Sequence, residues 1–308
     1  MQQQPLPPTD QKPVVRTMLF ALLPLLQALF WGIGNPVMKI GLAALPTFFC
    51  LSMRYGVATL LYLLLFPKRV LQHIPKRLRG RLLLISLVTA GSFICSNLSP
   101  TLTTATAAGF LMSTAVLFTP FLSVLLLKER FNKLHLIPIL AILIGMYLLC
   151  DVNGISVFGV GEFFALMSSV TTALVLVMSA DLLLQMDPVA LAAVQSGITA
   201  LVCVVTMLLR RELIPVSEIP AVGWAVIAYS AVFCTLICYL LQNLSLVKLS
   251  ATFVSLLLCA EPLFSAVAAA ILLNESLSGT GLTGAALIFC GIVGSSLLQG
   301  RESRGEAA

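Results

Sequence analysis

Long apolar runs separated by short polar segments dominate the chain. An α-helix crosses a bilayer with about 20 mainly apolar residues. Ten runs approach or exceed that length: 17–42, 46–66, 81–100, 103–127, 133–150, 159–183, 188–209, 221–246, 249–273 and 279–299. These runs are continuously apolar and do not alternate, which favours helices over the strands of a membrane β-barrel. The pattern therefore predicts an all-α polytopic membrane protein with ten transmembrane helices.

The composition excludes soluble classes of protein. Of the 308 residues, 59% are hydrophobic and 10% are charged, whereas soluble domains carry about 25% charged residues. Polar groups are too few to cover the surface of a soluble fold, so lipid must solvate most of the chain. All eight cysteines lie in or at the ends of apolar runs, without a CxxC pair. We interpret them as small apolar packing residues.

The uneven distribution of Lys and Arg predicts the orientation of the spans, because short cytoplasmic loops carry an excess of both residues. With a cytoplasmic N-terminus, fourteen of them fall inside: Lys12, Arg16, Lys68, Arg69, Lys76, Arg77, Arg79, Arg81, Lys128, Arg130, Lys133, Lys248, Arg301 and Arg304. Arg210 and Arg211 fall outside, with Lys39 at a helix end. We expect a multi-pass protein of the plasma (inner) membrane, with cytoplasmic tails at 1–16 and 301–308. This topology explains the net charge of +6, and no nucleic-acid partner is expected.

The second half of the sequence repeats the first. With an offset of 146 residues, Asn97-Leu98-Ser99 falls on Asn243-Leu244-Ser245, and Glu129 falls on Glu275. Earlier in each half the offset is 142, which places Pro46 on Pro188 at the start of a span. Each half, 17–150 and 151–300, then holds five spans. Because five is odd, the second repeat is inverted, which is the architecture of secondary transporters with a substrate site between the repeats.

Four segments carry a resemblance to a known family: "FWGIGNPVMKIGL" (30–42), "MRYGVATLL" (53–61), "TATAAGFLMSTAVLFTPFLSVLLLKER" (104–130) and "LSATFVSLLLCAEPLFSAVAAAILLNESLSGTGLTGAALIFCGIVGSSLL" (249–298). They resemble the drug/metabolite transporter superfamily and, within it, the EamA family of ten-helix exporters. The resemblance implies a secondary-active exporter of small metabolites that works by alternating access through a central cavity. On this resemblance, amino acids and related compounds are the first expected substrates. The alternatives are a multidrug transporter, or a transporter or facilitator of other metabolites, including sugar-linked ones.

Glu261 is the single formal charge in the run 249–273, and Pro262 follows it. A charge at a helix centre costs about 2.5–3.5 kcal/mol on insertion scales, so such residues usually face the bundle interior or a water-filled cavity. Pro262 also removes the helical bond to the Leu258 carbonyl. The Glu261 carboxylate and the freed Leu258 carbonyl could receive a cation, a proton or an ammonium group. Alternatively, Glu261 pairs with a buried donor and only holds helices together. The first half departs from this pattern, with Ala115 and Val116 at the matching positions.

Arg54 is the only other formal charge well inside a span. It could bind a substrate carboxylate through two parallel hydrogen bonds, or neutralise Glu261. The other cavity candidates are polar or aromatic residues within spans: Trp31, Asn35, Gln195, Tyr239 and Gln242. The repeat-related pairs Asn97 with Asn243 and Glu129 with Glu275 are interpreted as structural or gating residues at helix ends.

Other classes of protein lack their characteristic motifs. An intramembrane metalloprotease needs a cluster such as HExxH, whereas the only histidines are His73 and His135, in or beside loops. No GxxxxGK[ST] motif for ATP occurs. We therefore expect no catalytic residue, metal or cofactor, and keep an intramembrane enzyme or a structural membrane protein only as alternatives. The expected partners are a small-molecule substrate, membrane lipid, protons as a coupling ion, and a second copy in a homodimer, for which the glycine-rich last span offers a face.

Overall fold

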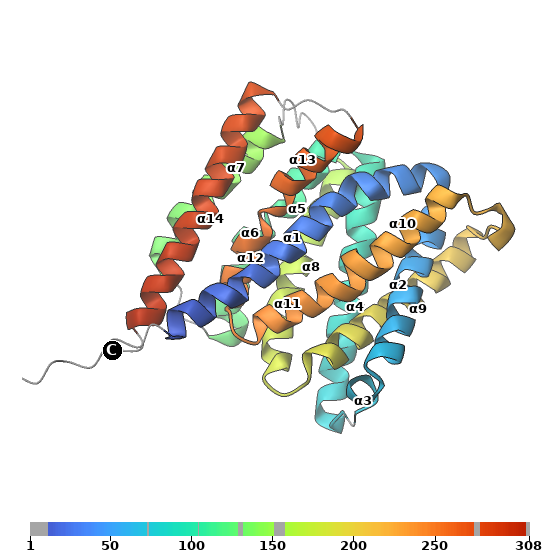
Figure 1. Cartoon of the computed structure of the whole chain (residues 1–308), viewed down its shortest axis with the longest axis horizontal. Helices are drawn as coiled ribbons and strands as arrows, with labels where there is room; N and C mark the ends of the chain where they lie inside the picture. The colour runs from blue at the N-terminus through green and yellow to red at the C-terminus, as the bar shows by residue number, and fades with distance from the viewer. Residues whose placement is uncertain are drawn as a thin grey trace, which may run out of the picture.

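A computed structural model describes residues 12–72, 74–103, 105–128, 132–150, 158–273 and 278–305. These residues form helices and connecting turns, with no β-strand among them. The α-helices are α1 (Lys12–Ala44), α2 (Thr47–Leu65), α3 (Pro67–Val70), α4 (Lys76–Leu102), α5 (Ala105–Ser113), α6 (Ala115–Leu122), α7 (Leu136–Leu149), α8 (Val160–Leu183), α9 (Pro188–Arg210), α10 (Ala221–Ala231), α11 (Cys238–Leu246), α12 (Ala251–Leu258), α13 (Glu261–Leu273) and α14 (Gly279–Gly305) (Figure 1). Short 3₁₀ segments are η2 (Lys133–His135) and η3 (Val216–Glu218), and π-helical segments are η1 (Ser123–Leu127) and η4 (Val232–Ile237).

The helices confirm the predicted all-α membrane fold. Within the described part of the chain, nine helical stretches are long and apolar enough to cross a bilayer. The fifth predicted span is represented by a shorter apolar helix, Lys133–Leu149. Its first turn is the 3₁₀ segment η2, in which the Asn132 side chain accepts a hydrogen bond from Leu134 N at 3.0 Å. The α-helical part, α7, therefore starts only at Leu136.

Packing between the helices follows the internal repeat. The second span packs on the seventh (α2 on α9), and the fifth packs on the tenth (α7 on α14). The third span, α4, packs on the sixth, α8, just as the eighth span, α10 with η4 and α11, packs on α1. The fourth span, α5 and α6, also lies on α8, as the ninth, α12 and α13, lies on α1. Exchanging the two halves therefore leaves these four contacts unchanged, as expected of two inverted five-helix repeats.

The fourth and ninth spans are both broken near their middle, at repeat-related positions. The ninth is interrupted at Cys259 and Ala260, and two residues later Pro262 cannot donate a helical hydrogen bond. The fourth is interrupted at Thr114, which corresponds to Ala260 when the two halves of the sequence are aligned with the offset of 146 residues. There the threonine hydroxyl donates to Leu111 O at 2.6 Å and lies 2.9 Å from the Ser169 hydroxyl. One break follows from a proline and the other from a side chain that competes for the backbone.

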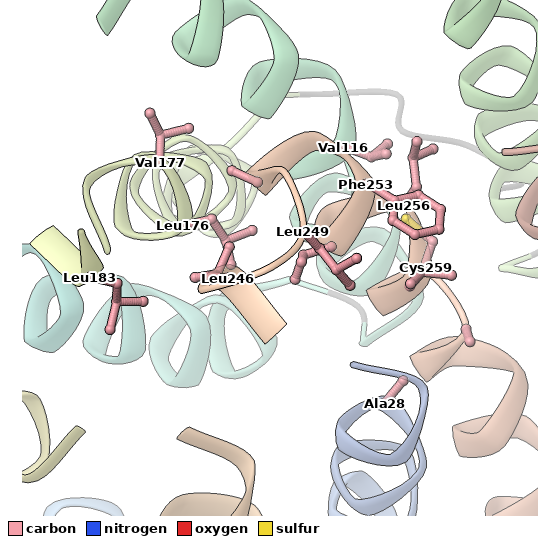
Figure 2. Packing of buried hydrophobic residues seen from close by; sticks show 14 of the residues in the cluster. Ala28, Val116, Leu176, Val177, Leu183, Leu246, Leu249, Phe253, Leu256 and Cys259 are labelled. Atoms are coloured by element: carbon pink, nitrogen blue, oxygen red, sulfur yellow. The ribbon is translucent and has the colours of Figure 1, made fainter. Parts of the chain in front are cut away.

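The two halves of the ninth span have different surroundings. α12 packs on α1, α6, α8, α11 and α14, and its residues 251–257 are all buried. The main contacts of α13 are with α1 alone, and residues 261–266, which together cover every side of the helix, are all half-exposed. Figure 2 shows Val116 of α6 beside Phe253 and Leu256 of α12, within one apolar cluster. The broken spans thus meet through α6 and α12.

Helices α7 and α14 approach so closely that glycine is required at their contact, along one edge of the bundle (Figure 1). A methyl group added to Gly284 would lie 2.5 Å from both Gly145 O and Leu149 N. A methyl group added to Gly145 would lie 2.6 Å from Gly284 O. The atoms in the way belong to backbone, so the helices would have to move apart.

We predict that Gly284→Ala lowers the free energy of unfolding by about 1–3 kcal/mol, because overpacking forces backbone shifts of this kind. Gly294→Ala on the same helix is the matched control, since no atom lies within 4 Å of its added methyl group. The control should unfold at the same temperature or higher, because Ala favours helices over Gly by about 1 kcal/mol. Equal melting temperatures of the two purified variants would contradict the contact.

Candidate functional site

Helix α1 lies between α13 and the eighth span, and glycines allow it to approach both. A methyl group on Gly32 would lie 2.6 Å from Phe264 Cβ and 2.8 Å from Glu261 O, so α1 meets α13 at the break in the ninth span. A methyl group on Gly34 would lie 2.6 Å from Cys234 Sγ, in the π-helical segment η4. The polar residues of α1 are therefore held against both of the irregular helices.

Glu261 is the first residue of α13 and contacts α1 through Asn35. The Asn35 side-chain amide donates to one Glu261 carboxylate oxygen at 3.0 Å and to the Ser265 hydroxyl at 3.4 Å. Asn35 is exposed, and Glu261 and Ser265 are half-exposed. Because intramembrane ionisable groups normally face the bundle interior or water, these three residues, which we call the α1–α13 polar cluster, are candidate substrate contacts.

The eighth span contains a π-helical segment, η4, whose backbone receives side chains from two other helices. The Cys234 carbonyl accepts from the Trp31 indole N–H at 2.8 Å and from the Arg54 guanidinium at 3.2 Å. Tyr62 donates its hydroxyl to the Leu236 carbonyl at 2.6 Å. Short π-helical segments within α-helices are frequent at functional sites. Here the additional donors come from α1 and α2, so both helices are tied to the irregular part of the eighth span.

Arg54 is 7% exposed and is bound inside the protein rather than facing a carboxylate. Its Nε donates to the Thr235 hydroxyl at 2.7 Å, and its guanidinium carbon lies 5.1 Å from the centre of the Tyr55 ring. The ion pairs within the described residues are Arg81 with Asp181 and Arg210 with Glu212. The sequence left two possible partners for Arg54, a substrate carboxylate or Glu261. In this structure Arg54 does not form an ion pair with Glu261.

Four aromatic rings surround this part of the eighth span. Phe93 lies 5.5 Å from Tyr55 and 5.8 Å from Tyr239, measured between ring centres. Trp31 contacts the edge of Phe93 at 6.5 Å. Phe93 and Trp31 are half-buried, whereas both tyrosines are buried with hydroxyls that make no hydrogen bond. The two half-buried rings form an apolar wall next to the polar groups of α1.

The remaining candidates from the sequence fall at other helix contacts. Gln242 accepts from the Gln27 side chain at 2.9 Å and thereby joins α11 to α1. Gln195 is buried and donates to Thr89 at 3.3 Å and to Ser179 at 3.4 Å, so it joins three helices. These contacts are inside the bundle and hold helices together.

The repeat-related asparagines are not used in the same way. Asn243 donates to Pro188 O at 3.2 Å, on the seventh span, whereas Asn97 donates to Phe93 O of its own helix at 2.8 Å. Glu129 and Glu275 lie outside the described residues.

Sequence reasoning did not single out three residues that contribute to these contacts. Gln27 is the first, and its signal was available, because it is a strongly polar side chain inside an apolar run. Ser265 lies one helical turn after Glu261, on the same face, and could have been found from that spacing. Tyr62 carries no such signal, since its role depends on a π-helical segment that the sequence does not mark.

Comparison with known proteins agrees with this architecture. The sequence matches the EamA-like transporter family over residues 18–150 and again over residues 159–297. A protein of Archaeoglobus fulgidus, described as an uncharacterized transporter, is 30% identical over 137 residues. That match covers 44% of this chain and 41% of the relative. A solved crystal structure shares the fold, with a TM-score of 0.75 and 18% identity, over 91% of this chain and 97% of the other.

We predict that Tyr62→Phe lowers the free energy of unfolding by about 1–3 kcal/mol, because the buried Leu236 carbonyl loses a donor. Tyr55→Phe is the matched control on the same helix, since the equally buried Tyr55 hydroxyl donates to no backbone carbonyl among the described residues. The control should be neutral or slightly stabilising. Thermal unfolding of the two variants measures the difference, and the reverse order would contradict the assigned role of Tyr62.

Proposed function

The chain belongs to the EamA-like transporter family, and from that membership we propose that it is a secondary-active exporter of small metabolites. Its membership and its apolar helices make it a multi-pass membrane transporter of small molecules. Amino acids and related compounds are the substrates that we propose first. The mechanism proposed is alternating access, in which the site opens in turn to each side of the membrane.

One observation carries this mechanism: among the described residues, the ninth span is buried on all sides before its break and packs chiefly on α1 after it. A transporter in one of its end states is sealed at one side and open at the other. The contact of α6 with α12 supplies the seal, and α13 borders the open side. Because the fourth span is broken at the matching position, exchanging the roles of the two repeats would generate the opposite state.

The distribution of Lys and Arg supports an orientation for this state. With both termini in the cytoplasm of a plasma or bacterial inner membrane, α12 and α6 are the cytoplasmic halves of their spans. α13 is then an outer half. The protein would therefore be open to the outside, with the α1–α13 polar cluster accessible from there.

We predict that a thiol on α13 reacts from outside, whereas a thiol on α12 does not. Ser265→Cys and Ser255→Cys are matched, since both lie on the ninth span, but Ser265 is half-exposed and Ser255 is 4% exposed. Cys95, Cys150 and Cys290 are first replaced, because they are the native cysteines that are not buried. A membrane-impermeant maleimide added to intact cells should label only the Ser265→Cys protein.

Labelling of Ser255→Cys and protection of Ser265→Cys would mean that the seal is on the outer side. Labelling of neither variant from outside, with Ser265→Cys labelled in inverted vesicles, would reverse the proposed orientation while keeping the one-sided opening.

Coupling to protons is proposed at Glu261, because it is the single formal charge in the run 249–273 and intramembrane carboxylates often belong to proton relays. We predict that Glu261→Gln abolishes uphill transport driven by a pH gradient in proteoliposomes. Counterflow at saturating substrate concentration should continue, since it needs no net proton movement. Uphill transport that still follows the pH gradient in Glu261→Gln would exclude this role, and Glu218→Gln on the exposed segment η3 is the charge-matched control.

A further inference from the structure

We propose that the α1–α13 polar cluster binds an organic ammonium group, so that the protein selects amines, whether or not they also carry a carboxylate. The site consists of Glu261, Asn35 and Ser265, together with the Leu258 carbonyl that precedes the break. This inference rests on the proposed transport function and specifies the chemical group by which the substrate is recognised.

The unused hydrogen-bonding capacity of the cluster belongs mainly to acceptors. Asn35 uses its N–H group toward Glu261 and Ser265, which leaves its carbonyl oxygen available. The second carboxylate oxygen of Glu261 receives no hydrogen bond from the described residues. Leu258 O also lacks its helical donor, because residue 262 is a proline without an N–H. Apart from the Ser265 hydroxyl, a ligand here meets acceptors, and an ammonium group supplies three donors.

The formal charge of the cluster itself is negative. Glu261 is half-exposed and Asn35 is exposed, whereas Arg54 is only 7% exposed. The Arg54 guanidinium is also held by Thr235 and the Cys234 carbonyl. Lys39 lies one turn beyond Asn35 toward the end of α1 and has interactions of its own. A substrate carboxylate therefore finds no comparable accessible cation within the cluster, while an ammonium group finds a carboxylate.

The rest of the ligand is expected to be apolar or aromatic. Trp31 lies four residues before Asn35 on the same face of α1, and its half-buried ring contacts the half-buried Phe93. Ring faces tolerate both apolar groups and nearby cations. A ligand with an ammonium head at Glu261 can thus lay its body along this wall.

Three probes that share a phenol ring test the head group: tyramine carries an amine, 3-(4-hydroxyphenyl)propionate carries a carboxylate, and tyrosine carries both. Binding to the purified full-length protein is measured by thermal stabilisation and by calorimetry. Tyramine and tyrosine should bind, and the propionate should not. In Glu261→Gln the affinity for both amines should fall about tenfold or more, which corresponds to about 1.4 kcal/mol.

Two further variants keep the test decisive if Glu261→Gln fails to fold. Asn35→Ala and Ser265→Ala retain the carboxylate and should weaken tyramine binding several-fold. Glu218→Gln, in the exposed segment η3, controls for net charge and should bind as the wild type does.

Binding of the propionate in preference to tyramine would overturn the proposal, as would unchanged tyramine binding in Glu261→Gln or no binding of tyramine at millimolar concentration. Counterflow of radiolabelled tyramine and propionate in proteoliposomes separates this failure from that of the transport function. Transport of the propionate alone would refute the ammonium site and leave the transporter standing. Glu261-dependent binding of tyramine without transport of any probe would support the ammonium site and refute the transport function.

Discussion

A bilayer offers no water to an unpaired backbone carbonyl, so each irregularity in a spanning helix needs another donor or an opening to water. This fold contains both solutions, side by side. In η4 the carbonyls of Cys234 and Leu236 accept hydrogen bonds from Trp31, Arg54 and Tyr62. At the break of the ninth span, in contrast, Pro262 removes the helical donor to the Leu258 carbonyl, no described side chain replaces it, and residues 261–266 are half-exposed. The first irregularity is a structural joint, and the second is where a polar ligand can be accommodated.

Duplication supplies the frame of the molecule, and the differences between the repeats supply its chemistry. Both repeats place a break in their fourth helix, so the geometry that suits alternating access is present twice. Only the second repeat carries a carboxylate there, since Ala115 occupies the position that matches Glu261. The first repeat breaks its helix with the Thr114 hydroxyl, which is satisfied by its neighbours. The second repeat therefore has a charge at its break, whereas the break of the first repeat has little polarity.

The sequence was sufficient for the features that depend on local pattern or on repetition. Apolar run length gave the helices, and the offset between halves predicted which helices correspond. The loss of the helical bond at Pro262 could be read from the sequence, and the ninth span breaks just before it, whereas no proline marks Thr114, where the fourth span breaks. Features that depend on contacts between distant helices could not be predicted. Arg54 could have met Glu261 or a substrate as far as the sequence was concerned; its placement beside Thr235 requires a π-helical segment without a recognisable signal.

The carbonyl of Cys234 has a mechanical consequence because two helices share it. Trp31 of α1 and Arg54 of α2 donate to the same oxygen, and Gly34 brings α1 against the same residue. Neither helix can leave the eighth span without breaking a hydrogen bond to this carbonyl, so α1 and α2 are both tied to the eighth span. The seam between α1 and α13, in contrast, is held by a glycine contact and the amide of Asn35. A ligand that bridges this seam would therefore link α13 to the group formed by α1, α2 and the eighth span.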